Sequence, residues 1–382
     1  MAGAIAYISR DTDGVQWKKV LEAGLGPVDF RPLDALGDKK DIEIVLAWKP
    51  PAGLIASFPN VKLIVSLGMG VDHLLADDRL PAGVPIVRIM DGGLVGQMSE
   101  YAIYWALRHH RDIDRYAASQ RARQWKPEDF VDTIDRRVGV MGLGSIGQDT
   151  AAKFAALGFP TAGWSRTART LPGIETFHGA DGFQRFLART DILVDVLPLT
   201  RDTRGLLDAK AFAALPKGAY LINMARGGHV VDEALLAALE SGQVSGAALD
   251  VFNVEPLPAD HPYWTHPKVH VTPHIAGATN PRTASPGVID NIKRLRAGQP
   301  LIHTMARSHP APCSECRTVA TTAQLANGPP WVPSGLTTKI SGPMAVAAPR
   351  EDVGAGAPVA LNTGMPRVMP WPTMPAIWLP TT

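Results

Sequence analysis

Three side chains in the second half of the chain could together perform acid–base chemistry on a small organic acid. Arg226, Glu255 and His274 each follow a short apolar run that we expect to be a β-strand. In an open α/β sheet, ligands bind beyond the carboxyl ends of the strands, so these residues can converge. Arginine offers a permanently charged fork for a carboxylate and a carbonyl oxygen. Histidine can donate a proton near neutral pH, and a neighbouring carboxylate favours its charged form.

Each of these residues has a commoner structural explanation when it is taken alone. An arginine after a strand is usually a surface residue, a histidine is usually a satisfied polar group, and a glutamate before proline usually belongs to a turn. All three occur in this order after a glycine-rich turn, Gly142–Gly147, of the kind that binds nucleotides. Chance explains this combination poorly. We therefore interpret them as a site for reducing a 2-keto acid, with Arg226 binding the acid, His274 as acid–base and Glu255 orienting His274.

A metal site is the alternative use of the histidines. His266, His270 and His274 are spaced by four, which would place them on one face of a helix. However, Pro267 and Pro273 interrupt a helix there, and the residues between them alternate as in a strand. We therefore expect no metal.

A glycine-rich turn predicts a dinucleotide site. Gly142, Gly144 and Gly147 form G-x-G-x-x-G between an expected strand, Val138–Met141, and an expected helix, Gln148–Leu157. The first glycine makes the tight turn, the second admits the pyrophosphate, and the third lets helix and strand pack closely. The helix N-terminus then offers free N–H groups to the phosphates. The strand before and the helix after favour this interpretation over a structural turn.

The residues after the next expected strand indicate which dinucleotide is bound. An acid there would bind the ribose 2′-hydroxyl of NAD, but this chain has Ser165, Arg166 and Arg169. Guanidinium groups pair well with a 2′-phosphate. We therefore predict NADP(H) over NAD(H); ordinary surface arginines are the alternative.

The elements that must position these residues follow an α/β rhythm in both halves of the chain. A long helix from Gln97 to about Gln120 is expected between the halves, and Asp232 is a plausible N-cap of a later helix. A partly helical segment, Asn280–Ala297, contains Pro281 and Pro286. The rhythm predicts parallel sheets. The expected strands are Ile5–Ser9, Ile42–Trp48, Val61–Leu67, Pro85–Ile89, Val138–Met141, Thr161–Trp164, Ile192–Leu197, Ala219–Asn223, Ala247–Phe252 and Val269–Thr272.

Composition excludes several classes of partner. The chain has 382 residues with 46% hydrophobic and 19% charged residues and a net charge of +2, which provides no broad basic field for nucleic acid or a membrane surface. No apolar run reaches the roughly 18 residues of a membrane span, and the N-terminus resembles a first strand, not a signal peptide. The only cysteines are Cys313 and Cys316, so we expect a cytoplasmic protein without structural disulfides.

The segment 308–382 differs from the rest. It holds 13 of the 33 prolines and has no helical or strand period, so we expect it to be disordered. Its Cys-x-x-Cys lacks a second pair and is best explained by chance. We hypothesise that the segment arose from a change of reading frame. The coding DNA tests this: the idea fails if no other frame after codon 307 offers a short, family-like ending.

Taken together, the motifs resemble the D-isomer-specific 2-hydroxyacid dehydrogenases, and within them the glyoxylate/hydroxypyruvate reductase A group. The resemblance covers about residues 1–307. It depends on the glycine turn and on three later motifs, which are Asn223-Met-Ala-Arg226-Gly, Asp250-Val-Phe-Asn-Val-Glu255-Pro and Thr272-Pro-His274-Ile-Ala.

The resemblance implies two Rossmann-like or flavodoxin-like, doubly wound domains, with a cofactor domain (98–277) inserted in a substrate domain (1–97 plus 278–307). It implies an NADPH-preferring reductase of glyoxylate and hydroxypyruvate and a homodimer with the long helix at its interface. Arg226, Glu255 and His274 take the roles given above. The loop Gly68-Met69-Gly70-Val71-Asp72 would hold the substrate carboxylate through its backbone N–H groups, with Met69 and Gly70 as the binding residues. Trp48 would line the substrate pocket. The expected cofactor-binding residues are Gly142, Gly144, Ser145, Ile146, Gly147, Ser165, Arg166, Arg169, Pro198, Ala225, Asp250 and Gly277.

Two other functions remain open. One is a dehydrogenase for a different D-2-hydroxy acid, which pocket size would decide. The other is a dinucleotide-sensing binding protein, against which the complete Arg226, Glu255 and His274 set argues.

Overall fold

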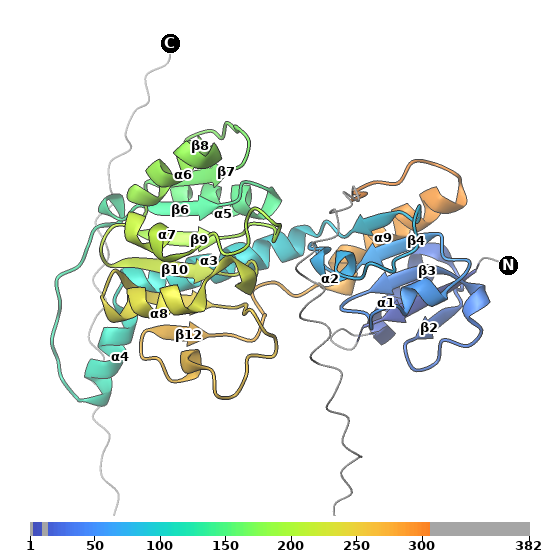
Figure 1. Cartoon of the computed structure of the whole chain (residues 1–382), viewed down its shortest axis with the longest axis horizontal. Coiled ribbons are helices and arrows are strands. Elements are labelled where there is room, and N and C mark those ends of the chain that lie inside the picture. Colours follow the sequence, from blue (N-terminus) through green and yellow to red (C-terminus); the bar gives the residue numbers. More distant parts are fainter. Residues whose placement is uncertain (1–2, 10–13, 306–382) are drawn as a thin grey trace, which may run out of the picture. The chain divides into compact units, whose positions relative to one another are not determined.

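The computed structural model describes residues 3–9 and 14–305 (Figure 1). The expectations about the segment 308–382, and about its two cysteines, lie outside the described residues. So do the last two residues of the expected substrate domain. Within the described part, no helix combines the length and the apolar character that a membrane span requires.

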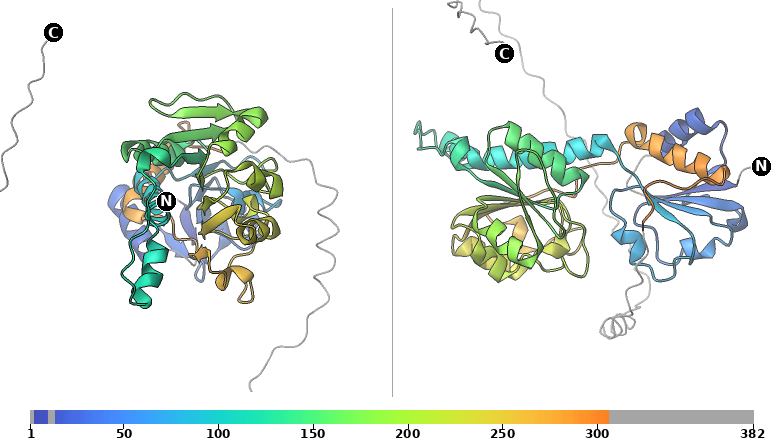
Figure 2. Two further views of the ribbon diagram at one scale, coloured as in Figure 1. Left: turned by 90° about the vertical axis from the view of Figure 1, so that its left-hand side faces the viewer. Right: turned by 90° about the horizontal axis from the view of Figure 1, so that it is seen from above.

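The first sheet has five parallel strands in the order β2-β1-β3-β4-β5. One face is covered by α1 (Gly14–Leu25) and by α9 (Pro281–Arg296), which lie side by side (Figure 2, right). Buried Trp17 and Leu21 of α1 and Val288 and Ile292 of α9 share one apolar cluster with alternate strand residues. The chain's late helix therefore completes its first sheet. The strands are β1 (Ala4–Ile8), β2 (Phe30–Pro32), β3 (Ile42–Ala47), β4 (Leu63–Ser66) and β5 (Ile86–Arg88).

The second sheet has seven parallel strands in the order β12-β11-β10-β9-β6-β7-β8. Its central strands β6, β9 and β10 are buried along their whole length, as expected for a parallel sheet covered on both sides. In β9, Ile192 and Val194 pack with α3 and α5, whereas Leu193 packs with α6, α7 and α8. The strands are β6 (Val138–Met141), β7 (Thr161–Ser165), β8 (Glu175–His178), β9 (Ile192–Asp195), β10 (Ala219–Asn223), β11 (Val244–Leu249) and β12 (Val269–Val271). The helices are α3 (Gly92–His110), α5 (Ser145–Ala156), α6 (Gly179–Ala188), α7 (Ala209–Ala214) and α8 (Asp232–Glu240).

Two doubly wound, parallel α/β sheets are thus confirmed. The expected strands all occur. Val138–Met141 and Ala219–Asn223 have the predicted ends, and the others are shifted; for example, the run expected at Val61–Leu67 is β4, and that at Ala247–Phe252 is β11. The division of the chain into a cofactor domain (98–277) and a substrate domain (1–97 plus 278–307) stays a prediction.

The single long helix expected between the halves is wrong. The segment contains α3 and a separate helix, α4 (Ile113–Arg121). Asp112 between them has left-handed backbone angles, φ 50° and ψ 35°, which end the first helix. Aspartate tolerates this conformation better than most residues. Helix α3 also begins earlier than expected, because the Asp91 carboxylate caps it by accepting the Gly93 amide at 2.8 Å.

The N-cap expected at Asp232 is also wrong. Asp232 is the first residue of α8, and its carboxylate accepts the Tyr263 hydroxyl at 3.0 Å and the Asn253 amide at 2.9 Å. Helix α9 is more complete than expected. Asn280 caps it by accepting the Arg282 amide, and the helix continues through Pro286.

Candidate active site

One cleft, of about 1750 Å³, is lined by residues from both sheets. It lies beyond the carboxyl ends of strands, where ligands of open α/β sheets bind. All of the residues proposed from the sequence line it. These are Arg226, Glu255, His274, Met69, Gly70, Trp48, Gly142, Gly144, Ser145, Ile146, Gly147, Ser165, Arg166, Arg169, Pro198, Ala225, Asp250 and Gly277.

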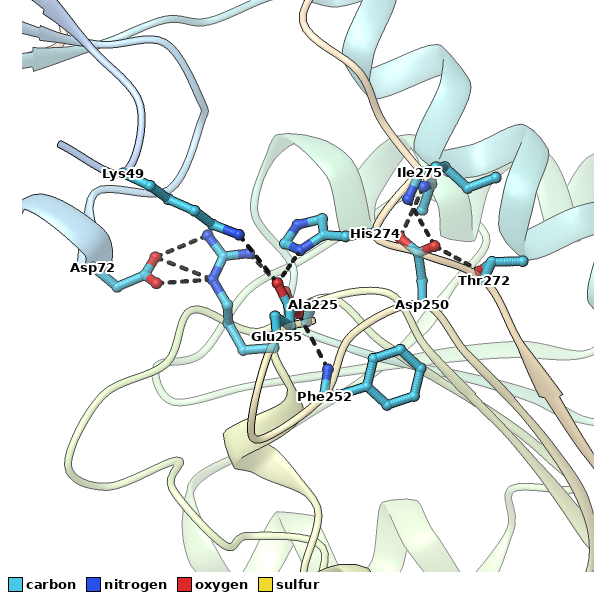
Figure 3. Close-up of polar contacts among 11 residues, drawn as sticks. Lys49, Asp72, Ala225, Asp250, Phe252, Glu255, Thr272, His274 and Ile275 are labelled. Carbon is cyan, nitrogen blue, oxygen red and sulfur yellow. Dashed lines mark hydrogen bonds and ion pairs between the residues drawn. The ribbon is translucent and has the colours of Figure 1, made fainter. Parts of the chain in front are cut away.

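His274 and Glu255 form a hydrogen-bonded pair in this cleft (Figure 3). Nδ1 of His274 lies 2.9 Å from Oε2 of Glu255, and the side chains are 28% and 21% exposed, so solvent screens them only partly. No described residue bonds the other imidazole nitrogen, which is therefore available to a ligand. The pair therefore has the geometry of an acid–base group oriented by a carboxylate.

The surroundings of Glu255 keep it ionised. Burial would raise the pKa of its carboxyl, but the hydrogen bond and charge of His274, the Phe252 amide and the Lys49 ammonium lower it to about 2. Nζ of Lys49 lies 3.3 Å from the same Oε2 that binds His274. A negative charge therefore faces the imidazole throughout the neutral pH range.

Asp250 holds the loop that presents His274. Its buried carboxylate accepts the Thr272 hydroxyl at 2.6 Å and the amides of Ile275 and Ala276 at 2.8 Å (Figure 3). The His274 amide donates to the Asp250 carbonyl at 2.8 Å, and His274 adopts a left-handed φ of 56°. Such a backbone conformation persists only where the surroundings impose it. Asp250 lines the cleft as expected, but its carboxylate shapes a loop.

Arg226 is presented by a tight turn after β10. The Asn223 side chain donates to the Arg226 carbonyl at 3.0 Å and accepts the Ala225 amide at 3.1 Å. The Arg226 guanidinium is bound by the carboxylate of Asp72. Because Asp72 follows β4, this ion pair joins the two halves of the site.

The expected substrate-binding loop lies beside Arg226. The Ser66 hydroxyl donates to the Gly70 carbonyl at 2.8 Å and fixes the loop that contains Met69. A Cβ at Gly70 would lie 2.0 Å from Nη2 of Arg226, so only glycine allows this approach. The loop backbone and the guanidinium thus form one surface for an anion.

Trp48 stands between two histidines. Its ring centre lies 4.5 Å from that of His73 and 6.4 Å from that of His274, the latter edge-on. Burial, the largest cause, lowers the pKa of His73 to about 4, so His73 is neutral near pH 7. Trp48 is therefore packed against an uncharged partner while it borders the cleft.

The glycine turn has the shape that a pyrophosphate requires. Gly142 has φ 103°, a conformation that L side chains rarely adopt. A Cβ at Gly147 would lie 1.7 Å from the Gly142 carbonyl oxygen, whereas a Cβ at Gly144 would meet no atom within 4 Å. The open side at Gly144 borders the cleft where α5 begins at Ser145. The described residues therefore fit a dinucleotide.

The loop after β7 places Arg166 and Arg169 along the same cleft, where both are exposed. Neither forms an ion pair with a described residue. The Ser165 hydroxyl donates to the Thr167 carbonyl at 2.8 Å, so its hydrogen stabilises the loop. Two cations are thus available to an anionic group at this end of the cleft.

The histidines spaced by four have separate surroundings. His270 lies on β12, confirming the strand that we expected there, and it contacts Asp114 at 2.9 Å. His266 accepts the Lys268 amide, and His274 pairs with Glu255.

Sequence reasoning missed Lys49 as a site residue, and it placed Asp72 only at the end of the expected substrate-binding loop, without its partner Arg226. Each lies near the carboxyl end of a strand of the first sheet, and each pairs with a residue more than 150 positions later. The only sequence signal for these two residues was their position after a strand. That position does not reveal that Lys49 pairs with Glu255 or that Asp72 pairs with Arg226.

Comparisons with known proteins identify the family that the chain resembles. Residues 103–276 match the family model of the D-isomer specific 2-hydroxyacid dehydrogenase NAD-binding domain. A glyoxylate/hydroxypyruvate reductase A from Serratia proteamaculans is 42% identical over 268 residues, which are 69% of this chain and 86% of that protein.

Two solved structures are similar over most of their length. A D-isomer specific 2-hydroxyacid dehydrogenase from Xanthobacter autotrophicus Py2, in complex with NADPH and MES, is 42% identical with a TM-score of 0.76, covering 80% of this chain and 98% of that one. An NADPH-dependent glyoxylate/hydroxypyruvate reductase from Sinorhizobium meliloti, in complex with NADP and sulfate, is 36% identical with a TM-score of 0.74, covering 79% and 98%.

Proposed function

The chain belongs to the D-isomer-specific 2-hydroxyacid dehydrogenase family and is an NAD(P)-dependent oxidoreductase, and we propose that it reduces glyoxylate and hydroxypyruvate with NADPH. The observation that carries the proposal is the His274–Glu255 pair, which shares one cleft with Arg226 and the glycine turn. The names of the relatives at 36–42% identity support this substrate class.

In this proposal the residues divide the work as the sequence predicted. The Gly142–Gly147 turn and α5 hold the pyrophosphate, and NADPH supplies the hydride when it is bound. Arg226 and the loop at Met69 and Gly70 bind the substrate carboxylate and polarise its carbonyl. His274 donates the proton to the carbonyl oxygen, and Glu255 stabilises the imidazolium before transfer.

The absorbance of NADPH with glyoxylate, hydroxypyruvate and pyruvate tests the function. We expect rapid oxidation with the first two acids and slower oxidation with NADH. Turnover of pyruvate or a larger acid alone would establish a different dehydrogenase. Folded protein that binds NADPH but reduces no 2-keto acid would favour the dinucleotide sensor.

The cofactor preference is expected to depend on Arg166 and Arg169. Replacing both with alanine should raise KM for NADPH about 10- to 100-fold, because two charge-assisted contacts to the 2′-phosphate are lost. KM for NADH should change less than twofold. Arg185→Ala is the matched control, since Arg185 is exposed on α6 and does not line the cleft. An equal change for both cofactors would contradict the assignment.

A homodimer is the proposed assembly, supported by exposed apolar side chains in and after α4. Trp125 is fully exposed, and Phe130 and Ile134 are 73% and 71% exposed. Several large apolar side chains left exposed in one segment often mark an interaction site. We expect Trp125→Glu with Phe130→Glu to halve the mass measured by light scattering, whereas Val15→Glu should leave it unchanged. A wild-type monomer would rule the dimer out.

The domain division at residues 98–277 and a cytoplasmic location also remain proposals. The matched family region, 103–276, lies within the proposed cofactor domain. The absence of cysteine before Cys313 supports a reducing compartment.

A further inference from the structure

The ion pair between Arg226 and Asp72 engages one whole edge of the guanidinium. Nε of Arg226 lies 3.1 and 3.0 Å from Oδ1 and Oδ2 of Asp72, and Nη2 lies 2.8 Å from Oδ1. A bidentate carboxylate fixes the plane of an arginine as well as its position. The two side chains are 23% and 36% exposed, so the pair is partly shielded from water.

The remaining donors of Arg226 can be counted. A guanidinium has five N–H bonds. Asp72 accepts from Nε and Nη2, and the Ala225 carbonyl accepts from Nη1 at 2.6 Å. Among the described residues no further acceptor contacts Arg226, so one hydrogen remains on each terminal nitrogen. The fork left for a ligand is therefore the Nη1–Nη2 edge.

The origin of Asp72 gives the pair a role beyond local packing. Asp72 is the first residue of α2 (Asp72–Leu75) and directly follows the loop that contains Gly70. The loop expected to bind the substrate carboxylate and the carboxylate that orients Arg226 thus belong to one short segment. Burial raises the pKa of Asp72, but the hydrogen bonds and charge of Arg226 outweigh it and lower the pKa below its ordinary value. Asp72 is therefore ionised when the site works at neutral pH.

We propose that Asp72 is a positioning residue for the reaction: it binds the Nε–Nη2 edge of Arg226 and so directs the free Nη1–Nη2 edge at the carboxylate and carbonyl of the 2-keto acid. The inference rests on the proposed function, because that function requires Arg226 to bind the acid. It predicts that Asp72 affects binding and turnover of the acid through Arg226 and leaves NADPH binding unchanged.

The first test is Asp72→Asn, which keeps the shape of the side chain and removes its charge. We expect kcat/KM for hydroxypyruvate to fall about 10- to 100-fold, as for a misplaced catalytic group, with the dissociation constant of NADPH changed less than twofold. Asp72→Glu keeps the charge, so its kcat/KM for hydroxypyruvate should fall less than that of Asp72→Asn. Asp290→Asn removes a comparable partner from Arg294 in α9, outside the cleft, and should have no effect.

A second measurement does not depend on turnover. Oxamate, a keto-acid isostere that accepts no hydride, should bind Asp72→Asn at least about 10-fold more weakly by calorimetry in the presence of cofactor. In the Arg226→Lys background, Asp72→Asn should add less than threefold to either loss, since the bidentate contact is already gone.

The outcomes separate this inference from the proposed function. A wild-type protein that reduces no 2-keto acid overturns the function, and oxamate binding still tests Asp72. Asp72→Asn within twofold of wild type in kcat/KM and oxamate binding overturns the inference alone. The inference also fails if Asp72→Asn causes the same fold-loss in the Arg226→Lys background as in the wild type. That result would show that Asp72 acts independently of Arg226.

Discussion

His274→Asn is expected to lower kcat for hydroxypyruvate by about 10³-fold and to leave the dissociation constant of NADPH within twofold of wild type. General acid catalysis by a positioned side chain contributes about 10²- to 10⁴-fold. Asparagine is the suitable replacement because residue 274 has a left-handed φ of 56°, which asparagine tolerates better than alanine. Its amide can also donate to Glu255, which keeps that carboxylate hydrogen-bonded. Stopped-flow absorbance of NADPH measures the rate, and quenching of protein fluorescence measures cofactor binding.

His270→Asn provides the control for this prediction. His270 also contacts a carboxylate, that of Asp114 at 2.9 Å, but it lies on β12 and does not line the cleft. Its replacement should leave kcat within twofold. A His274→Asn protein that retains a tenth or more of the wild-type kcat would show that another group supplies the proton.

The ionisation of Glu255 does not contribute to the pH dependence of the reduction rate near neutral pH. The folded pKa of Glu255 is about 2, below its ordinary value of 4.5, so its ionised form is favoured by folding. The resulting stabilisation is fully present above pH 4.5 and is lost as the pH falls toward 2. Between pH 5 and 9 Glu255 therefore does not titrate. A fall in reduction rate with rising pH in that range would report loss of the donated proton, not a change at Glu255.

Local sequence patterns predicted much of the fold because they depend on local physics. The apolar strands of a buried parallel sheet are continuous hydrophobic runs, and β10 was found with both ends as expected. The edge strands β2 and β8 were missed. Phe30–Pro32 is only three residues long, and β8 has two exposed residues among its four, so neither shows a buried pattern.

The break between α3 and α4 could not be predicted for a related reason. It depends on one backbone conformation at Asp112, which stands within an otherwise unbroken helical pattern. Aspartate adopts that conformation only sometimes, so its presence alone does not end a helix. The residues that surround Asp112 in the fold determine its conformation, and the sequence does not show which residues these are.

The candidate site shows the same division between local and long-range information. The glycine turn was predictable because its steric demands arise within a few residues; a Cβ at Gly147, for example, would lie only 1.7 Å from the Gly142 carbonyl oxygen. The Asp72 partner of Arg226 was not, because it lies 154 residues away and is brought there by the meeting of the two halves of the site. The contact of Lys49 with Glu255 could not be predicted for the same reason, because the two residues are 206 positions apart in the sequence.

Arg226→Gln is the second replacement expected to have a large effect, with a fall of about 10³-fold in kcat/KM for hydroxypyruvate. Glutamine can still donate a hydrogen bond, but it lacks the charge that balances the substrate carboxylate and the developing alkoxide. It also leaves the Asp72 carboxylate, 36% exposed, without its counter-ion beside the anion that must bind. The repulsion should appear mainly in KM, and the lost stabilisation of the transition state should appear in kcat.

Arg137→Gln is the matched control for this second prediction. Arg137 also makes a bidentate ion pair, with Nε and Nη2 at 3.0 and 2.7 Å from Asp191, but it does not line the cleft. Its replacement should change the melting temperature without changing kcat/KM more than twofold. If Arg226→Gln retained a tenth of the wild-type kcat/KM, the acid would be held by the loop at Met69 and Gly70 alone. Both the catalytic role of Arg226 and the positioning role of Asp72 would then have to be abandoned, because the proposed positioning by Asp72 works through that guanidinium.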